Sequence, residues 1–188
     1  AYRAALASRP LEIAPAFAGP QSYPDLKTDF RSTREFGPTE RAEAVASMVA
    51  RARAAGLSAS GSVWVKNAER AVANTSGLAA YAPSTRAAVV LVVMGGTGSG
   101  HAERVSRDVR TIDFDEVARD AVETCLHSQG PSEVPPGRYQ VLLLPNAVAD
   151  MLAALAVMGL GAKSVQDGRS FMCASRGRRV VSESITLT

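Results

Sequence analysis

Apolar side chains recur at helical spacing in two segments of the chain. The first segment begins at Gly37-Pro38, where proline suits the first helical position because its missing N–H would be unpaired there anyway. The second begins at Asp113, which forms a capping box with Glu116. Its apolar stripe consists of Phe114, Val117, Ala118, Ala121, Val122 and Cys125. The pattern predicts two amphipathic helices, of which the first ends at Gly56.

Residues 57–110, between these helices, are rich in valine and small residues. The run 87–94 is apolar throughout, which is typical of a strand buried on both faces. Turn signals stand at Lys66-Asn67, at residues 74–77, at Tyr81-Ala82-Pro83 and at residues 95–100. Strands separated by such turns predict an antiparallel meander.

Three further elements are expected after residue 137. They are a strand over residues 139–144, a helix over residues 147–162 with many Ala and Gly positions, and a last strand over residues 180–187. The small side chains of the helix require a closely packed neighbour. The order of elements predicts an α+β fold, an antiparallel sheet with helices packed on it, rather than a repeating βαβ fold.

The organisation of the chain is expected to change near residue 36. Residues 1–36 contain four prolines and are expected to form a helical end and a linker, whereas residues 37–188 form the α+β domain. The chain begins at Ala1 rather than Met and stops directly after a predicted strand. We therefore expect these 188 residues to be the central segment of a longer protein.

Composition narrows the class of protein. A hydrophobic fraction of 46% excludes a disordered chain, and a net charge of +3 is too small and scattered to indicate nucleic-acid binding. The first ten residues lack the order of a signal peptide, and the longest apolar run, residues 151–162, is too short to span a bilayer. We therefore expect no membrane contact. Because only two cysteines are present, a reducing, cytoplasmic setting is also expected.

The glycine cluster at residues 95–100 could cradle a phosphate through its backbone N–H groups. It lacks the lysine of a phosphate-binding loop and does not open a helix. A tight hairpin turn is therefore the preferred interpretation.

Few side chains are candidates for catalysis. Cys125 and His127 could form a thiolate pair, but residues two apart on a helix point to different faces, and Cys125 lies on the apolar stripe. Cys173 resembles core filler, and His101 beside Ser99 has no orienting carboxylate at a fixed spacing. The cluster Arg176, Arg178 and Arg179 could bind an anion but is more typical of a solvated turn. No catalytic, cofactor-binding or metal-binding residue is assigned.

Six short segments together resemble a known family. They are PGRYQVLLLP at 136–145, NAVADML at 146–152, DGRSF at 167–171, SESITLT at 182–188, ANTSGL at 73–78 and TGSG at 97–100. Their order and spacing over residues 30–188 resemble the TldD/PmbA family, the modulator of DNA gyrase proteins. The resemblance implies a family of zinc peptidases that act on peptides.

In the catalytic TldD type, the resemblance places a His-Glu-x-x-x-His motif on the helix after residue 144. There the two imidazoles bind zinc, the Glu acts on the bound water, and a further ligand comes from downstream. In this chain Ala153, Ala154 and Met158 stand at the three motif positions. The loss resembles the TldE/PmbA type, so zinc is expected only in a catalytic partner subunit.

The first hypothesis is a non-catalytic TldE/PmbA-like subunit that processes peptides in a dimer with a TldD-like subunit. The alternative is a homo-oligomeric binding or scaffold protein of the same fold that acts without a peptidase partner. A third is a hydrolase that uses Cys125 or His101. No nucleic-acid partner is expected in any of these.

Overall fold

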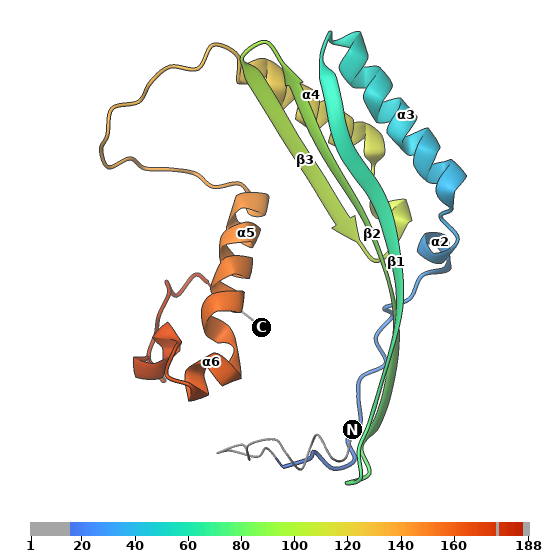
Figure 1. Ribbon diagram of the computed structural model, residues 1–188, viewed down its shortest axis with the longest axis vertical. Helices are drawn as coiled ribbons and strands as arrows, with labels where there is room; N and C mark the ends of the chain where they lie inside the picture. Colours follow the sequence, from blue (N-terminus) through green and yellow to red (C-terminus); the bar gives the residue numbers. More distant parts are fainter. Residues whose placement is uncertain (1–15, 176, 186–188) are drawn as a thin grey trace, which may run out of the picture. The chain divides into compact units, whose positions relative to one another are not determined.

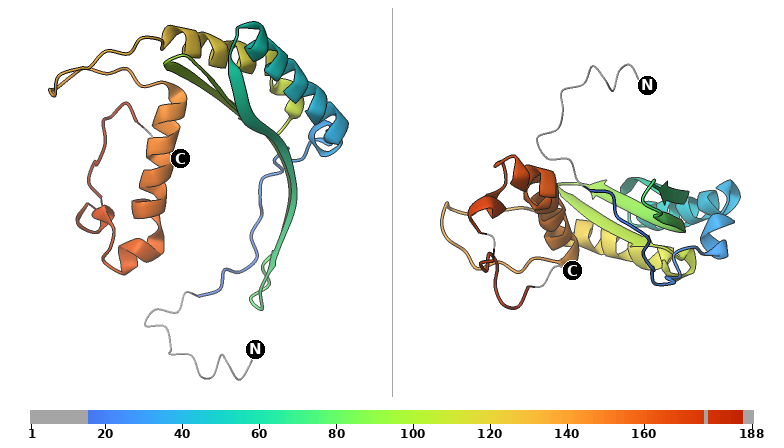
Figure 2. Two further views of the ribbon diagram at one scale, coloured as in Figure 1. Left: turned by 45° about the horizontal axis from the view of Figure 1, so that its top comes forward. Right: turned by 90° about the horizontal axis from the view of Figure 1, so that it is seen from below.

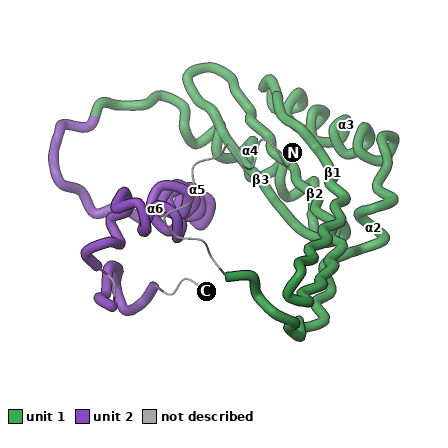
Figure 3. The backbone as a smooth tube through the Cα atoms, turned by 60° about the horizontal axis from the view of Figure 1, so that its bottom comes forward, with its two compact units in different colours: residues 1–133 green, residues 134–188 purple. Residues whose placement is uncertain are grey.

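A computed structural model describes residues 16–175 and 177–185. The chain divides into two compact units, Ala1–Glu133 and Val134–Thr188, which are coloured separately in Figure 3. Each unit is described by itself. The helical end expected at the start of residues 1–36 falls on residues 1–15, which lie outside the described residues, and the expected boundary at residue 36 remains a prediction.

A three-stranded antiparallel sheet forms the centre of the first unit (Figure 1). Its strands are β1 (Ser58–Ala73), β2 (Ala79–Gly95) and β3 (Gly98–Ser106), in the order β1-β2-β3. The register places Leu91 of β2 between Gly61 of β1 and Ala102 of β3. The predicted meander is therefore confirmed, and with it the α+β class.

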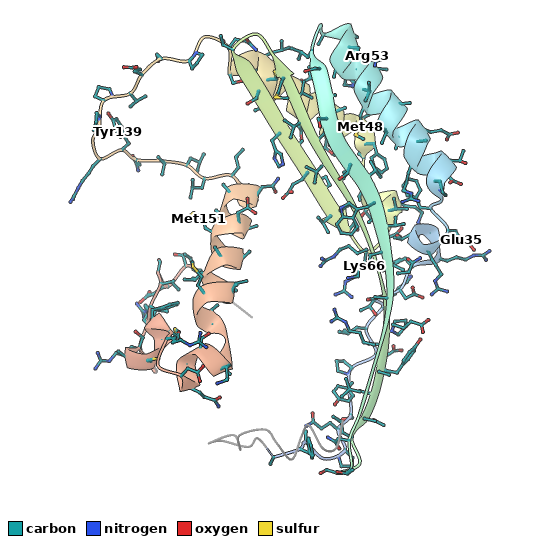
Figure 4. The ribbon with its side chains drawn as sticks, in the orientation of Figure 1. Glu35, Met48, Arg53, Lys66, Tyr139 and Met151 are labelled. Atoms are coloured by element: carbon teal, nitrogen blue, oxygen red, sulfur yellow. The ribbon has the colours of Figure 1, made fainter. Side chains whose placement is uncertain are left out.

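Two helices, α3 (Pro38–Ala54) and α4 (Phe114–His127), cover one face of this sheet (Figure 2). Met48 lies on the side of α3 that faces the strands (Figure 4). The core is made of Met48, Ala52, Ala87, Val89, Leu91, Val93, Ala102, Val109, Ile112, Val117, Ala118, Ala121, Val122 and Cys125. Burial of these side chains away from water is the main favourable contribution to the stability of the unit.

The ends of both helices agree with the sequence signals. Gly37 precedes Pro38 at the start of α3, and Gly56 follows its last residues with φ of 73°. At α4 the Asp113 carboxylate accepts a hydrogen bond of 3.0 Å from the backbone N–H of Glu116. The capping arguments therefore place both helices correctly.

Two of the four predicted turns are wrong. Lys66-Asn67 lies within β1 and Tyr81-Ala82-Pro83 within β2, and the two segments belong to one continuous ladder in which Asn67 pairs with Thr85. Proline is tolerated because β3 pairs only with residues 87–95 of β2, so the missing N–H of Pro83 interrupts no second ladder. The turn expected at residues 74–77 is confirmed, and the one expected at residues 95–100 is a shorter turn at Gly96-Thr97, because residues 98–100 already belong to β3.

The expectation that residues 87–94 are buried on both faces is wrong for most of the run, although Ala88, on the face opposite the helices, is only 2% exposed. Val89, Leu91 and Val93 face the helices and are fully buried or nearly so. Val90 and Val92 point to the opposite face and are half-buried, and Met94 is 47% exposed. The side opposite α3 and α4 is called the outer face below. Alternating exposure of this kind is ordinary for an antiparallel sheet.

Beyond the end of β3, β1 and β2 continue as a two-stranded arm (Figure 1). The extended segment 16–30 runs beside β2 in this arm, where Thr28 O accepts from Thr85 N at 3.0 Å and Ala18 O accepts from Asn74 Nδ2 at 2.9 Å. A short helix, α2 (Arg31–Arg34), follows it. The segment 16–30 therefore covers the edge of β2 that β3 leaves open, and it is called the strap below.

The second unit is helical. It contains α5 (Pro145–Leu155), the π-helical turn η2 (Ala156–Leu160), α6 (Ala162–Gln166) and the 3-10 helix η3 (Phe171–Ala174). The helix expected at 147–162 is present as α5 and η2. Among the described residues, none of the helices is long and apolar enough to cross a membrane.

The two strands expected in this unit are absent from its described residues. Residues 139–144 are extended, but no other described segment pairs with them, and a strand needs a partner for its backbone groups. Leu142 is 93% exposed and Val141 72%. Residues 180–185 form no strand either, and 186–188 lie outside the described residues.

Candidate functional site

The α5–η2 segment carries the three positions at which the resemblance implies a metal motif. Ala153 and Ala154 lie in the last turns of α5, and Met158 lies in η2. Met158 is 69% exposed, and no residue of α5 is buried. The segment is therefore accessible within its own unit but presents only methyl groups and a thioether at these positions.

The π-helical turn changes how positions five residues apart relate to one another. In an α-helix, side chains at i and i+5 differ in direction by about 140°. A π turn, with hydrogen bonds from i to i+5, winds more slowly and brings such positions closer to one face. The local backbone at Ala156–Leu160 thus suits the spacing of the implied motif, although the side chains do not.

The DGRSF segment holds this turn in place. Ser170 is buried, and its hydroxyl donates to the carbonyl of Gly159 and accepts from Met172 N at 2.9 Å. The ring of Phe171 lies so close to Gly159 that a Cβ there would overlap it. Phe171 is therefore the close neighbour that the small residues of this helix require. Both motifs are visible in the sequence, but the packing of one on the other is not.

A zinc ion does not fit the side chains present. Zinc in proteins takes imidazole, thiolate and carboxylate ligands. None of Ala153, Ala154 and Met158 supplies such a ligand. In the part of the chain that the structure describes, no group of three or more His, Cys, Asp or Glu residues could hold a metal. We therefore derive no chemistry through a metal held by this segment.

Asp167 is the best-connected charged residue of the second unit. Its carboxylate accepts hydrogen bonds from Lys163 Nζ at 2.5 Å and from Arg169 Nη2 at 2.7 Å. The hydrogen bond from Lys163, followed by that from Arg169, lowers the pKa of Asp167. Both cations are exposed to solvent. We therefore interpret the cluster as surface ion pairs that stabilise the loop before Ser170, not as a reactive centre.

The glycine cluster is a hairpin turn docked on the end of α4. Gly96 has φ of 58° at the first central position of the two-residue loop, as a type II′ turn requires. Thr97 N donates to Gln129 Oε1 at 3.0 Å, and Ser99 N donates to Ser128 Oγ at 3.0 Å. Because these backbone groups are used in packing, the preference for a hairpin over a phosphate loop is confirmed.

The candidate nucleophiles are not assembled into a catalytic site. Cys125 is fully buried and its thiol contacts Gly98 O at 3.5 Å, whereas His127 is exposed. Ser99 and His101 both point to the outer face of β3, but no hydrogen bond among the described residues joins them. Neither pair has the nucleophile-to-base contact that activation needs.

The arginine cluster near the end of the chain is only partly described, because Arg176 lies outside the described residues. Arg178 and Arg179 are exposed, and Arg179 forms an ion pair with Glu183. Gly177 has φ of 75° between them and Arg176. The described part is a turn in solvent, in agreement with the interpretation from the sequence.

One cluster was missed by the sequence analysis. Four cations line a groove of about 450 Å³ in the first unit, at the level where β3 ends. They are Lys66, Arg70, Arg86 and Arg107. They are up to 41 residues apart in sequence, and only the strand register brings them together. The expected turn at Lys66-Asn67 hides this cluster in the sequence, because it breaks the strand that carries Lys66 and Arg70.

Comparisons with known proteins match a family model and several solved structures. Residues 136–188 match a family model described as the PmbA/TldA metallopeptidase C-terminal domain. A Thermotoga maritima protein, whose description proposes a role as modulator of a DNA gyrase, has 17% identity and a TM-score of 0.68 over 85% of this chain and 38% of its own. TldE from Thermococcus kodakarensis has 20% identity and a TM-score of 0.57 over 66% of this chain and 30% of its own. No curated protein sequence gives a significant match.

These matches support the fold of the chain and a family relationship for residues 136–188. The solved structures share the fold of the chain, which spans only about a third of the length of each, and the family model covers the helical unit with the α5–η2 segment. Both kinds of match agree with the TldD/PmbA resemblance that the six sequence segments carry.

Proposed function

We propose that this chain is part of a non-catalytic, TldE/PmbA-like subunit that processes peptides in the cytoplasm together with a zinc-bearing, TldD-like subunit. The observation that carries the proposal is the α5–η2 segment, where Ala153, Ala154 and Met158 replace the metal-binding residues of the catalytic type. The segment forms a helix and a π-helical turn but carries no metal ligand at these three positions.

The packing around this segment supports a role for its shape. Ser170 and Phe171 hold Gly159 in a defined position even though no metal ligand needs to be oriented. A subunit that forms one wall of a peptide-processing cavity would need that wall to be rigid. The catalytic zinc, its water and the general base then belong to the partner.

Zinc analysis tests the proposal directly. The purified protein is exposed to zinc, dialysed and measured by elemental analysis, and we expect much less than one zinc per chain. A triple variant, Ala153→His, Ala154→Glu and Met158→His, restores the donors and should retain more zinc than the native chain. A matched control with Gln at all three positions adds side-chain bulk without an imidazole or a charge. Stoichiometric zinc in the native protein would contradict the proposal.

Activity measurements separate the proposal from its alternative. The protein is mixed with a TldD-like protein from the same genome, and hydrolysis of short peptides is followed with each component alone and with both. We expect activity to require the zinc-bearing protein and to increase when this subunit is added. A protein that forms homo-oligomers and binds peptides, and leaves the activity of the TldD-like protein unchanged, would favour the scaffold alternative.

A further inference from the structure

The groove of four cations lies on the outer face of the first unit, where the arm begins. Strand β1 contributes Lys66 and Arg70, β2 contributes Arg86, and Arg107 follows the last residue of β3. Lys66 is labelled at this level of β1 in Figure 4. The rest of the lining is small: Ala68, Ser84, Thr85, Val105 and Ser106. The groove thus has four positive charges around it and no carboxylate in its lining.

These charges are not neutralised within the part of the chain that the structure describes. Lys66 and Arg86 are direct cross-strand partners, and like charges placed opposite one another destabilise a sheet. None of the four cations forms an ion pair with a described carboxylate. Glu103 lies on the same face of β3 but does not line the groove. An anion between the strands would relieve the repulsion.

The backbone beneath the groove is fixed by buried hydroxyl groups. Thr85 Oγ1 donates to Arg107 O at 2.9 Å, and Thr33 Oγ1 donates to the same carbonyl at 2.8 Å. Thr33 Oγ1 also accepts from Val109 N at 2.7 Å. Both threonines are almost completely buried. The positions from which Arg86 and Arg107 project are therefore set by the core, which limits the ordering that a ligand must impose.

The surroundings favour a peptide over a nucleic acid. Three of the four cations are arginines, whose planar guanidinium groups bind carboxylates through two parallel hydrogen bonds. Single-stranded nucleic acids also need aromatic side chains on which successive bases stack. No aromatic side chain lines the groove. Trp64 lies outside the lining, two residues from Lys66 on the same face, and one ring does not offer the series of stacking sites that a nucleic-acid strand uses.

We propose that this groove binds an acidic peptide segment, whose carboxylates lie between Lys66, Arg86 and Arg107. The proposal rests on the proposed role in peptide processing and narrows the substrate class to peptides rich in Asp or Glu. No covalent step is involved.

Trp64 provides a direct readout. It is the sole tryptophan of the sequence and is 37% exposed, so its emission reports on this face alone. Hexaglutamate is titrated into the protein while Trp64 emission is recorded, and calorimetry measures binding independently of fluorescence. Hexaglutamine and a thymidine hexanucleotide are titrated in parallel. We expect binding of hexaglutamate that weakens with added salt, no binding of hexaglutamine, and weaker binding of the hexanucleotide.

A pair of charge-reversal variants locates the site. Lys66→Glu with Arg86→Glu should weaken hexaglutamate binding by at least about tenfold, because two attractions become repulsions. The control, Arg51→Glu with Arg119→Glu, changes the net charge equally at exposed positions of α3 and α4, outside the groove. We expect the control to bind within about twofold of the native protein at 0.15 M salt, where distant charges are screened. Lys66→Gln with Arg86→Gln repeats the test if the reversed pair fails to fold.

Three outcomes would overturn the proposal. They are the absence of both binding heat and emission change with hexaglutamate, equal weakening in the groove and control variants, and tighter binding of the hexanucleotide than of hexaglutamate. These measurements need neither zinc nor a partner subunit. A failure of the groove is therefore distinguishable from a failure of the non-catalytic role, which the zinc analysis decides.

Discussion

The two units of this chain bury their apolar side chains to very different extents. In the first unit, Val89, Val93 and Val117 are fully enclosed between a sheet and two helices. In the second unit, Leu142 is 93% exposed and Val157 83%. The apolar composition of the two units is similar, so composition does not decide where stability lies. The stability of each unit depends on whether a second layer covers its apolar face.

The difference also separates the roles of the units. The first unit has a complete hydrophobic core, and this core fixes the backbone from which the groove cations project. The second relies on local contacts, such as those of Ser170 and Phe171 with Gly159. We therefore expect substitutions in the first unit to change global stability and those in the second to act locally.

The largest effect is expected from Gly100→Ala. A Cβ at Gly100 would overlap the carbonyl of Ala121 and lie 2.6 Å from Cys125 N, so β3 and α4 would have to separate. We expect a loss of about 3 kcal/mol or more in the free energy of unfolding, measured by urea denaturation. Gly19→Ala is the control, because its nearest neighbour, Ser76 O, would be 3.9 Å away. Equal stability of both variants would show that the layers are loosely packed.

A matched pair of valine substitutions compares the units directly. Val93→Ala removes two buried carbon atoms from the first unit and should lower the free energy of unfolding by about 2 kcal/mol. Val157→Ala makes the same change at an exposed position of η2 and should alter it by less than about 0.5 kcal/mol. Thermal or urea denaturation followed by circular dichroism measures both. A larger effect at Val157 would mean that the second unit also depends on a buried core.

A local effect is expected from Ser170→Ala. The substitution removes the hydroxyl that donates to Gly159 O, and a buried carbonyl without a partner costs about 1–3 kcal/mol. Amide hydrogen exchange should become faster in η2 and η3 while protection of the sheet stays unchanged. Ser175→Ala is the control, since Ser175 is at most half-buried and its hydroxyl makes a longer bond of 3.3 Å to Phe171 O. Faster exchange throughout the sheet would contradict a local role.

The smallest effect concerns acid stability. Hydrogen bonds from Arg110 and Ser32 hold the pKa of Asp108 well below its ordinary value. A carboxylate with a lowered folded-state pKa stabilises the fold above its unfolded-state pKa, near 3.9, and the contribution is lost as the pH falls toward the folded value. Asp108→Asn should therefore be less stable at neutral pH and lose less stability below about pH 4. The free energy of unfolding is measured as a function of pH for both proteins. The same pH dependence in the native protein and in Asp108→Asn would contradict this prediction.

Local signals predicted much of the first unit. The Asp113–Glu116 cap, the proline at the start of α3 and the glycine turns act within a few residues, so the sequence alone indicates them. The packing stripe of α4 follows from helical period in the same way. These features need no knowledge of distant partners.

Pairing between distant segments could not be predicted in the same way. Lys66-Asn67 and Tyr81-Ala82-Pro83 have the composition of turns, but each is held in a strand by pairing with a distant segment: Lys66-Asn67 with Thr85-Arg86, and residues 81–83 with residues 69–71. The groove cations and the contact between Ser170 and Gly159 likewise depend on register and packing rather than on spacing. Residues 139–144 show the reverse case, in which strand-like composition forms no strand because no described segment pairs with it.

The strap has a consequence for the order of folding events. The two strands of the arm are joined by a short turn, so they can pair as a local hairpin within about microseconds. The strap reaches β2 across 55 residues of sequence, as in the bond from Thr28 Oγ1 to Pro83 O, and such distant contacts form late because the loop must close first. Until the strap docks, the outer edge of residues 79–86 is an unpaired strand edge, which is a template for aggregation. The folding intermediate most exposed to association is therefore the one in which the arm is complete and the strap is still free.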